Sequence, residues 1–93
     1  MRSVDLALYA DALAGEAASL AARIERERGK QRQASIEREA RAALRPFAVE
    51  RLEELGLLAT RADVAAIAEL EESLDALELL QAWVEGALSR AAA

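Results

Sequence analysis

The fold of this chain is decided by residues 64–90, VAAIAELEESLDALELLQAWVEGALSR. Large apolar residues recur in this stretch at alternating spacings of three and four, the pattern of a helix that packs lengthwise against another helix. The spacing predicts a coiled-coil-like last helix over residues 61–91. Its apolar stripe consists of Ile67, Leu70, Leu74, Leu77, Gln81, Val84 and Leu88, where Gln81 either fixes the register or marks a stripe that opens to solvent.

Toward its end, the apolar surface of this helix becomes wider than one stripe. A second strip lies beside the first, and a single neighbouring helix cannot cover both. Exposed apolar strips mark contacts with other proteins, and tryptophan is enriched at the dominant positions of such contacts. We therefore predict a partner-binding surface, the α-helical "apolar strip", made of Leu79, Leu80, Trp83, Ala87 and Leu88.

A second helix is expected near the N-terminus, over residues 4–28. One of its faces repeats apolar residues at helical spacing. We expect this face to supply the missing apolar neighbour of the last helix, either within the same chain or from a second chain. The face consists of Leu6, Leu13, Leu20 and Ile24, with Tyr9 or Ala10 and Ala17 between them.

The stretch 25–33, ERERGKQRQ, contains no large apolar residue and allows two structures. Its residues are good helix formers and Gly29 costs only about 1 kcal/mol in an exposed helix, which allows one continuous helix. The charges instead favour a turn, because basic residues suit the end of one helix while Glu37 and Glu39 suit the start of another. Both structures stay open, and the second gives a separate helix over residues 35–55.

Two further boundaries are expected at Pro46 and at residues 60–63, TRAD. Pro46 has no backbone donor, so the helix over residues 35–55 should kink or restart there. Thr60 is expected to cap the last helix, with Asp63 reaching back as in a capping box. The expected fold is all-α: one domain over residues 1–93, a small antiparallel bundle (a helical hairpin or three helices), completed within the chain or by dimerisation.

The charges divide the chain, whose net charge is −5. Residues 23–45 hold eight Arg or Lys against four Glu, whereas residues 46–93 hold three basic against ten acidic residues. A turn near residue 58 would place Arg38, Arg41 and Arg45 level with Glu78, Asp75 and Glu71. Such surface pairs contribute little stability, but they disfavour a wrong alignment.

A different use of the basic residues is contact with phosphate. Four basic residues at alternate positions are candidates for an anion contact. Nucleic-acid-binding proteins bind phosphate groups with such side chains. The chain is acidic overall and has no aromatic residues among them, so nucleic acid is not the partner that we expect. The candidates are Arg26, Arg28, Lys30 and Arg32.

The residue types argue against catalysis. The chain has no Cys and no His, so it lacks a thiolate nucleophile, the usual neutral-pH base and the commonest metal ligand. We expect no enzyme, no cofactor, no metal site and no small-molecule substrate. Asp5, Asp11 and Glu16 interrupt the apolar residues near the N-terminus, so we expect neither a signal sequence nor a membrane span, and a cytoplasmic protein.

Residues 71–80, EESLDALELL, resemble the D-S-L-D-x-x-E-L sequence around the serine that acyl carrier proteins load with phosphopantetheine. In that family the serine opens a helix after a long loop. Here the helix expected from Thr60 has run three turns before Ser73, and Glu72 replaces the usual Asp. We therefore expect Ser73 to be an ordinary helix residue beside the apolar stripe.

Together these features predict a non-catalytic protein–protein interaction module, a small scaffold or accessory subunit that acts through apolar helix faces. Its partner would be a second copy of the chain, in a homo-oligomer, or another protein. The alternative is a charge-based regulator that binds nucleic acid or inhibits a nucleic-acid-binding protein.

Overall fold

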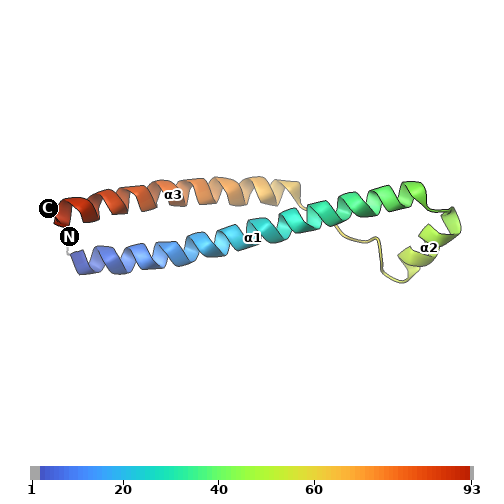
Figure 1. Cartoon of the computed structure of the whole chain (residues 1–93), viewed down its shortest axis with the longest axis horizontal. Coiled ribbons are helices and arrows are strands. Elements are labelled where there is room, and N and C mark those ends of the chain that lie inside the picture. The colour runs from blue at the N-terminus through green and yellow to red at the C-terminus, as the bar shows by residue number, and fades with distance from the viewer. Residues whose placement is uncertain (1–2, 93) are drawn as a thin grey trace.

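The computed structural model describes residues 3–92, and these residues form three helices and no strand. The helices are α1 (Ser3–Ala43), α2 (Pro46–Glu54) and α3 (Val64–Ala92). Helices α1 and α3 pack side by side and run in opposite directions (Figure 1). The all-α class predicted from the sequence is confirmed, and the packing of α1 against α3 is compatible with the expected antiparallel bundle.

The molecule is a thin rod. Its principal extents are 70 × 18 × 15 Å and its Cα radius of gyration is 21.2 Å, whereas a compact domain of this length has a radius of gyration of about 12 Å. We call the end at which α1 begins and α3 ends the open end, and the end that carries α2 the loop end (Figure 1). Among residues 3–92, the main packing between elements is that of α1 against α3, so of the two expected arrangements the structure resembles the helical hairpin.

Helix α1 is continuous through the stretch 25–33, so of the two structures left open there the continuous helix is the observed one. The bounds 4–28 and 35–55, which belong to the other structure, are wrong. Arg, Glu, Lys and Gln all favour the helix, and one Gly does not outweigh them. Two ion pairs within the stretch add support: Lys30 Nζ donates to Glu27 at 2.9 Å and Arg32 Nη2 to Glu25 at 3.1 Å. In this stretch, the helix propensity of the residues outweighs the charges that favour a turn.

Of the two outcomes expected at Pro46, a kink or a restart, the structure shows the restart. Arg45 is extended (φ −67°, ψ 147°), and Pro46 occupies the first turn of α2, where its missing N–H is not needed. The nine-residue α2 buries none of its side chains and ends before Gly56, whose φ of 78° is in the left-handed region. Leu58 also has a positive φ, of 59°, and from there the chain runs extended along α1 to α3.

Helix α3 begins at Val64, and its cap is Asp63 rather than Thr60. The Asp63 carboxylate accepts a hydrogen bond from the backbone N–H of Ala66 at 3.0 Å, which satisfies one of the free donors at the helix start. The Thr60 hydroxyl instead joins the extended segment to α1, where it donates to Glu37 at 3.0 Å and accepts from Gln33 at 2.8 Å. The expected capping box is therefore wrong in its cap residue.

The core lies along the half of the hairpin nearest the open end. Leu6 and Leu13 of α1 form a buried cluster with Val84 of α3, and Ile24 and Ile67 are buried farther along. Ala10, not Tyr9, completes the α1 face. Partly buried residues packed against the cluster are Ala10, Leu77, Leu80, Ala87 and Leu88.

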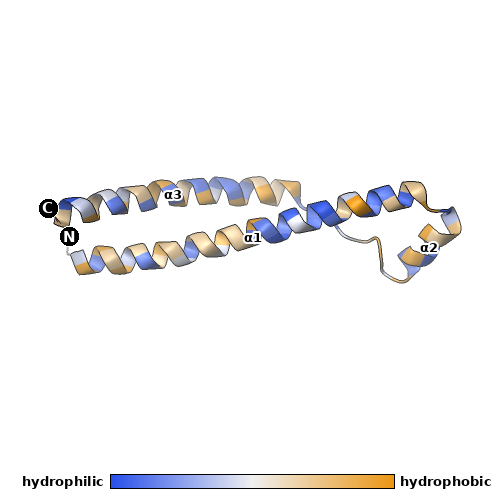
Figure 2. Cartoon of the chain, viewed as in Figure 1, coloured by the Kyte–Doolittle hydropathy of each residue, from blue (hydrophilic) through white to orange (hydrophobic). Residues whose placement is uncertain are grey.

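The register of the hairpin differs from the one expected. Arg28 pairs with Glu71, and Arg41 pairs with Glu53 of α2, so Arg38, Arg41 and Arg45 do not lie level with Glu71 to Glu78. The reason is the connection: α2 and the extended segment after it carry the chain back along α1 before α3 starts. The charged part of α1 therefore begins beside the first turns of α3, where Arg28 pairs with Glu71, and continues beyond them. Figure 2 shows this change from apolar to hydrophilic residues along α1. No helix among residues 3–92 is both long and apolar enough to cross a membrane.

Candidate interaction site

The apolar strip is divided by the structure into a packed part and an exposed part. Leu80, Ala87 and Leu88 are partly buried against the core cluster. Leu79 and Trp83 are 75% and 53% exposed, on the side of α3 that α1 does not reach. The strip therefore has a packed base of three residues within the hairpin and two large side chains that keep half or more of their surface exposed.

Three exposed residues at the start of α1 lie at the same end of the rod as the apolar strip. Val4, Leu8 and Tyr9 each have large accessible areas. Sequence reasoning placed Tyr9 as a possible core residue and did not single out Val4 and Leu8. The spacing of the sequence does indicate that they are exposed, because Leu6, Ala10 and Leu13 already make up the face of the helix that is expected to be buried.

The four basic residues proposed as an anion contact do not form one surface. Arg28 is paired with Glu71, Lys30 with Glu27 and Arg32 with Glu25. Residues two apart on a helix point to opposite sides, so Arg26, Arg28, Lys30 and Arg32 are spread around α1. A phosphate backbone lying along one side of α1 could therefore reach only part of the set at once.

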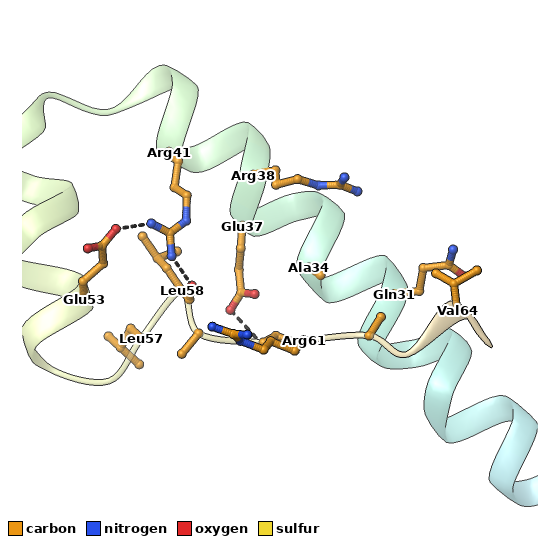
Figure 3. A pocket seen from close by; sticks show the side chains of 13 residues that line it. Gln31, Ala34, Glu37, Arg38, Arg41, Glu53, Leu57, Leu58, Arg61 and Val64 are labelled. Carbon is orange, nitrogen blue, oxygen red and sulfur yellow. Dashed lines mark hydrogen bonds and ion pairs between the residues drawn. The ribbon is translucent and has the colours of Figure 1, made fainter. Parts of the chain in front are cut away.

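A groove at the loop end was not foreseen. It encloses about 650 Å³ between the second half of α1, the end of α2 and the extended segment 57–64 (Figure 3). Arg41 closes one end, because its guanidinium donates both to the Glu53 carboxylate and to the Leu58 carbonyl oxygen. In Figure 3, Glu37 points from α1 toward the extended segment, where Thr60 donates to one of its oxygens.

In the groove, polar contacts between α1 and the extended segment take the place of the apolar contacts between α1 and α3. Where α3 is absent, the inward side chains of α1 change from apolar to polar and hold an extended segment through hydrogen bonds. One oxygen of Glu37 is buried there without a hydrogen-bond partner among the described residues. The sequence carried a signal for this in the polar residues Gln31, Glu37 and Arg41, which continue the spacing of the apolar face.

Ser73 lies in the middle of α3, and its hydroxyl donates to the Glu69 carbonyl oxygen at 3.0 Å. This is the ordinary hydrogen bond of a serine inside a helix, and the position is not a helix start.

Among residues 3–92, no group of three or more His, Cys, Asp or Glu is arranged to hold a metal ion.

Comparisons with known proteins add no relative: no family model matches the chain, and no match is found among curated proteins or solved structures.

Proposed function

We propose that this chain is a non-catalytic protein–protein interaction module, a small scaffold or accessory subunit that binds its partner through the apolar strip of α3. The observation that carries the proposal is the exposure of Leu79 and Trp83 beside a base that is already packed. A rigid base lowers the entropy lost on binding, because only the two outer side chains have to become ordered. Aromatic and aliphatic anchors of this kind dominate the affinity of many interfaces.

The chain provides a matched pair of variants for a test. Leu79→Ser with Trp83→Ala removes the exposed part of the apolar strip, whereas Leu55→Ser with Phe47→Ala removes one Leu and one aromatic residue that are exposed at the loop end. Each immobilised variant is incubated with an extract of the source cells. We expect the strip variant to lose the protein that the native chain retains, and the loop-end variant to keep it.

The salt dependence of this retention separates the two classes of function. Apolar contacts persist at high ionic strength, whereas charge-driven complexes weaken strongly between about 0.15 and about 1 M salt because the Debye length falls to about 3 Å. Retention at high salt supports the interaction module. Retention that survives the strip substitutions but disappears at high salt overturns it in favour of the charge-based regulator.

The fluorescence of Trp83 reports directly on contact between the apolar strip and a partner, because Trp83 is the chain's one tryptophan. When the retained protein is added to the purified chain, the tryptophan emission is expected to shift to shorter wavelength and to resist a soluble quencher. Unchanged quenching in the complex would place the partner elsewhere.

A further inference from the structure

The side of α1 that faces away from α3 carries no charge along its centre. Residues there recur every seven positions, as the inward row does: Leu8, Gly15, Ala22, Gly29, Ile36 and Ala43, which we call the outer face of α1. Leu8 is 64% and Ile36 66% exposed. A side chain added at Gly15 would meet nothing within 4 Å, and one added at Gly29 would meet only the end of the Arg32 side chain, at 3.7 Å. No other element of residues 3–92 therefore comes within 4 Å of the outer face at either glycine.

The charge of α1 changes sign near the middle of this face. Between Ser3 and Ala22 there are three acidic residues and no basic one, whereas between Arg23 and Ala43 there are seven basic residues against four acidic ones. A second α1 lying antiparallel would place each acidic half beside a basic half. A parallel copy would place like charges together, which is unfavourable.

The accessible area of the chain is larger than that of a compact monomer, because the chain is a thin rod. The chain exposes 6943 Å², about 1,700 Å² more than the roughly 5,200 Å² expected for a compact monomer of 10.0 kDa. A standard interface buries about 800 Å² of each partner. The excess is therefore enough for one such interface along α1 and still leaves area for the apolar strip.

The apolar strip itself is a poor surface for self-association. It lies at the open end, where Ser3–Ala22 and Glu72–Ala92 together hold seven acidic residues against one basic residue. Two copies joined strip to strip would bring these acidic ends together. The charges thus direct a second copy to α1 and leave the strip for a different protein.

We propose that two copies of this chain form an antiparallel, twofold-symmetric dimer through the outer face of α1. The symmetry axis passes at Ala22, which places Leu8 opposite Ile36 of the second copy and Gly15 opposite its Gly29. Asp11 then comes level with Arg32 of the second copy. Arg32 now pairs with Glu25 at 3.1 Å across the surface of α1, where both side chains are exposed and free to exchange partners.

The absence of cysteine makes the geometry directly testable. Ala22→Cys places two thiols at the symmetry axis, so mild oxidation of the full-length chain is expected to convert most of it to a disulfide-linked dimer. Ala65→Cys, an exposed alanine on α3, is the matched control and is expected to stay largely monomeric on a denaturing, non-reducing gel. Disulfides require Cα atoms within about 7 Å, so the reaction reports close approach.

Orientation is tested with Leu8→Cys, which should not cross-link to itself but should cross-link to the Ile36→Cys variant when the two are mixed. Self-linking of Leu8→Cys as readily as Ala22→Cys would show a parallel pair and overturn the proposal. So would a native mass of 10.0 kDa, the monomer value, at the highest concentrations in sedimentation equilibrium.

A second variant guards against chemical artefacts of cysteine. Ala22→Arg places two like charges at the axis and is expected to weaken dimerisation at least tenfold, while circular dichroism stays helical because residue 22 is exposed. The proposed function is distinguishable in the same samples. Ala22→Arg should still retain the partner of the apolar strip, whereas the Leu79→Ser, Trp83→Ala variant should still dimerise. An Ala22→Arg chain that dimerises as the native chain does overturns the proposal.

Discussion

Val84 has no accessible surface, and it shares its cluster with Leu6 and Leu13 of α1. Because so few side chains of this rod are buried, each one accounts for a large part of the contact between the helices. We expect Val84→Ala to lower the free energy of unfolding by about 2 kcal/mol, through lost burial and the cavity that remains. Urea denaturation followed by circular dichroism measures the change.

The control for this substitution is Val64→Ala, which makes the same chemical change on the same helix at a position that is 61% exposed. Exposed substitutions away from special contacts usually change stability by less than about 0.5 kcal/mol. Equal effects of the two substitutions would mean that the Val84 cluster does not hold the hairpin together.

Gln81 is a partly buried polar residue in the apolar stripe of α3, between Leu77 and Val84. A polar residue at such a position lowers stability, and in many helix pairs it fixes the register. We expect Gln81→Leu to raise the free energy of unfolding by about 1 kcal/mol, because apolar area replaces a desolvated amide. The urea midpoint measures this, and a lower midpoint would show that the amide makes a contact needed for folding.

At the scale of elements, the start of α3 depends on Asp63. Removing an N-cap side chain costs about 1 kcal/mol, and Asn caps about as well as Asp. We therefore expect Asp63→Ala to be less stable by about that amount and Asp63→Asn to be close to the native chain, as measured by thermal unfolding. A loss of stability of the same size in both variants would point to the charge of Asp63 and not to the hydrogen bond with Ala66.

The elements could be predicted from the sequence where apolar residues repeat, as in α3, and where a residue removes a backbone donor, as Pro46 does. They could not be predicted where weak effects compete. In residues 25–33 helix propensity and end charges favour opposite outcomes, each by about 1 kcal/mol or less. Thr60 and Asp63 are both good caps, and only the side chains of Gln33 and Glu37, which bind Thr60, decide between them.

The apolar strip was partly predictable for a related reason. Helical spacing identified Leu79, Leu80, Trp83, Ala87 and Leu88 as one broad surface, but it could not tell which of them α1 covers. That depends on the register of the hairpin, which is set by the length of the connection through α2 and the extended segment. The exposure of Leu79 and Trp83 could therefore be learned only from the structure.

At the scale of the whole molecule, the continuous α1 makes the chain a rod. Small-angle X-ray scattering is expected to give a maximum dimension close to the 70 Å extent of one chain. The proposed dimer keeps this dimension, since its copies lie side by side while the mass doubles. A radius of gyration near the roughly 12 Å of a compact domain of this length would instead require a break in α1.

The position of the connection has a mechanical consequence. Helix α3 is joined to the connection at one of its ends, beside Gln31 and Ala34 of α1, and its other end meets α1 through a small cluster of apolar side chains. With 29 residues, α3 forms a lever arm about 43 Å long, and a pivot of ten degrees at Val64 would separate the tips by about 7 Å. The Val84 cluster lies near the far end of this arm, where a contact of given strength resists opening most effectively, so a few buried side chains are enough to keep the two tips together.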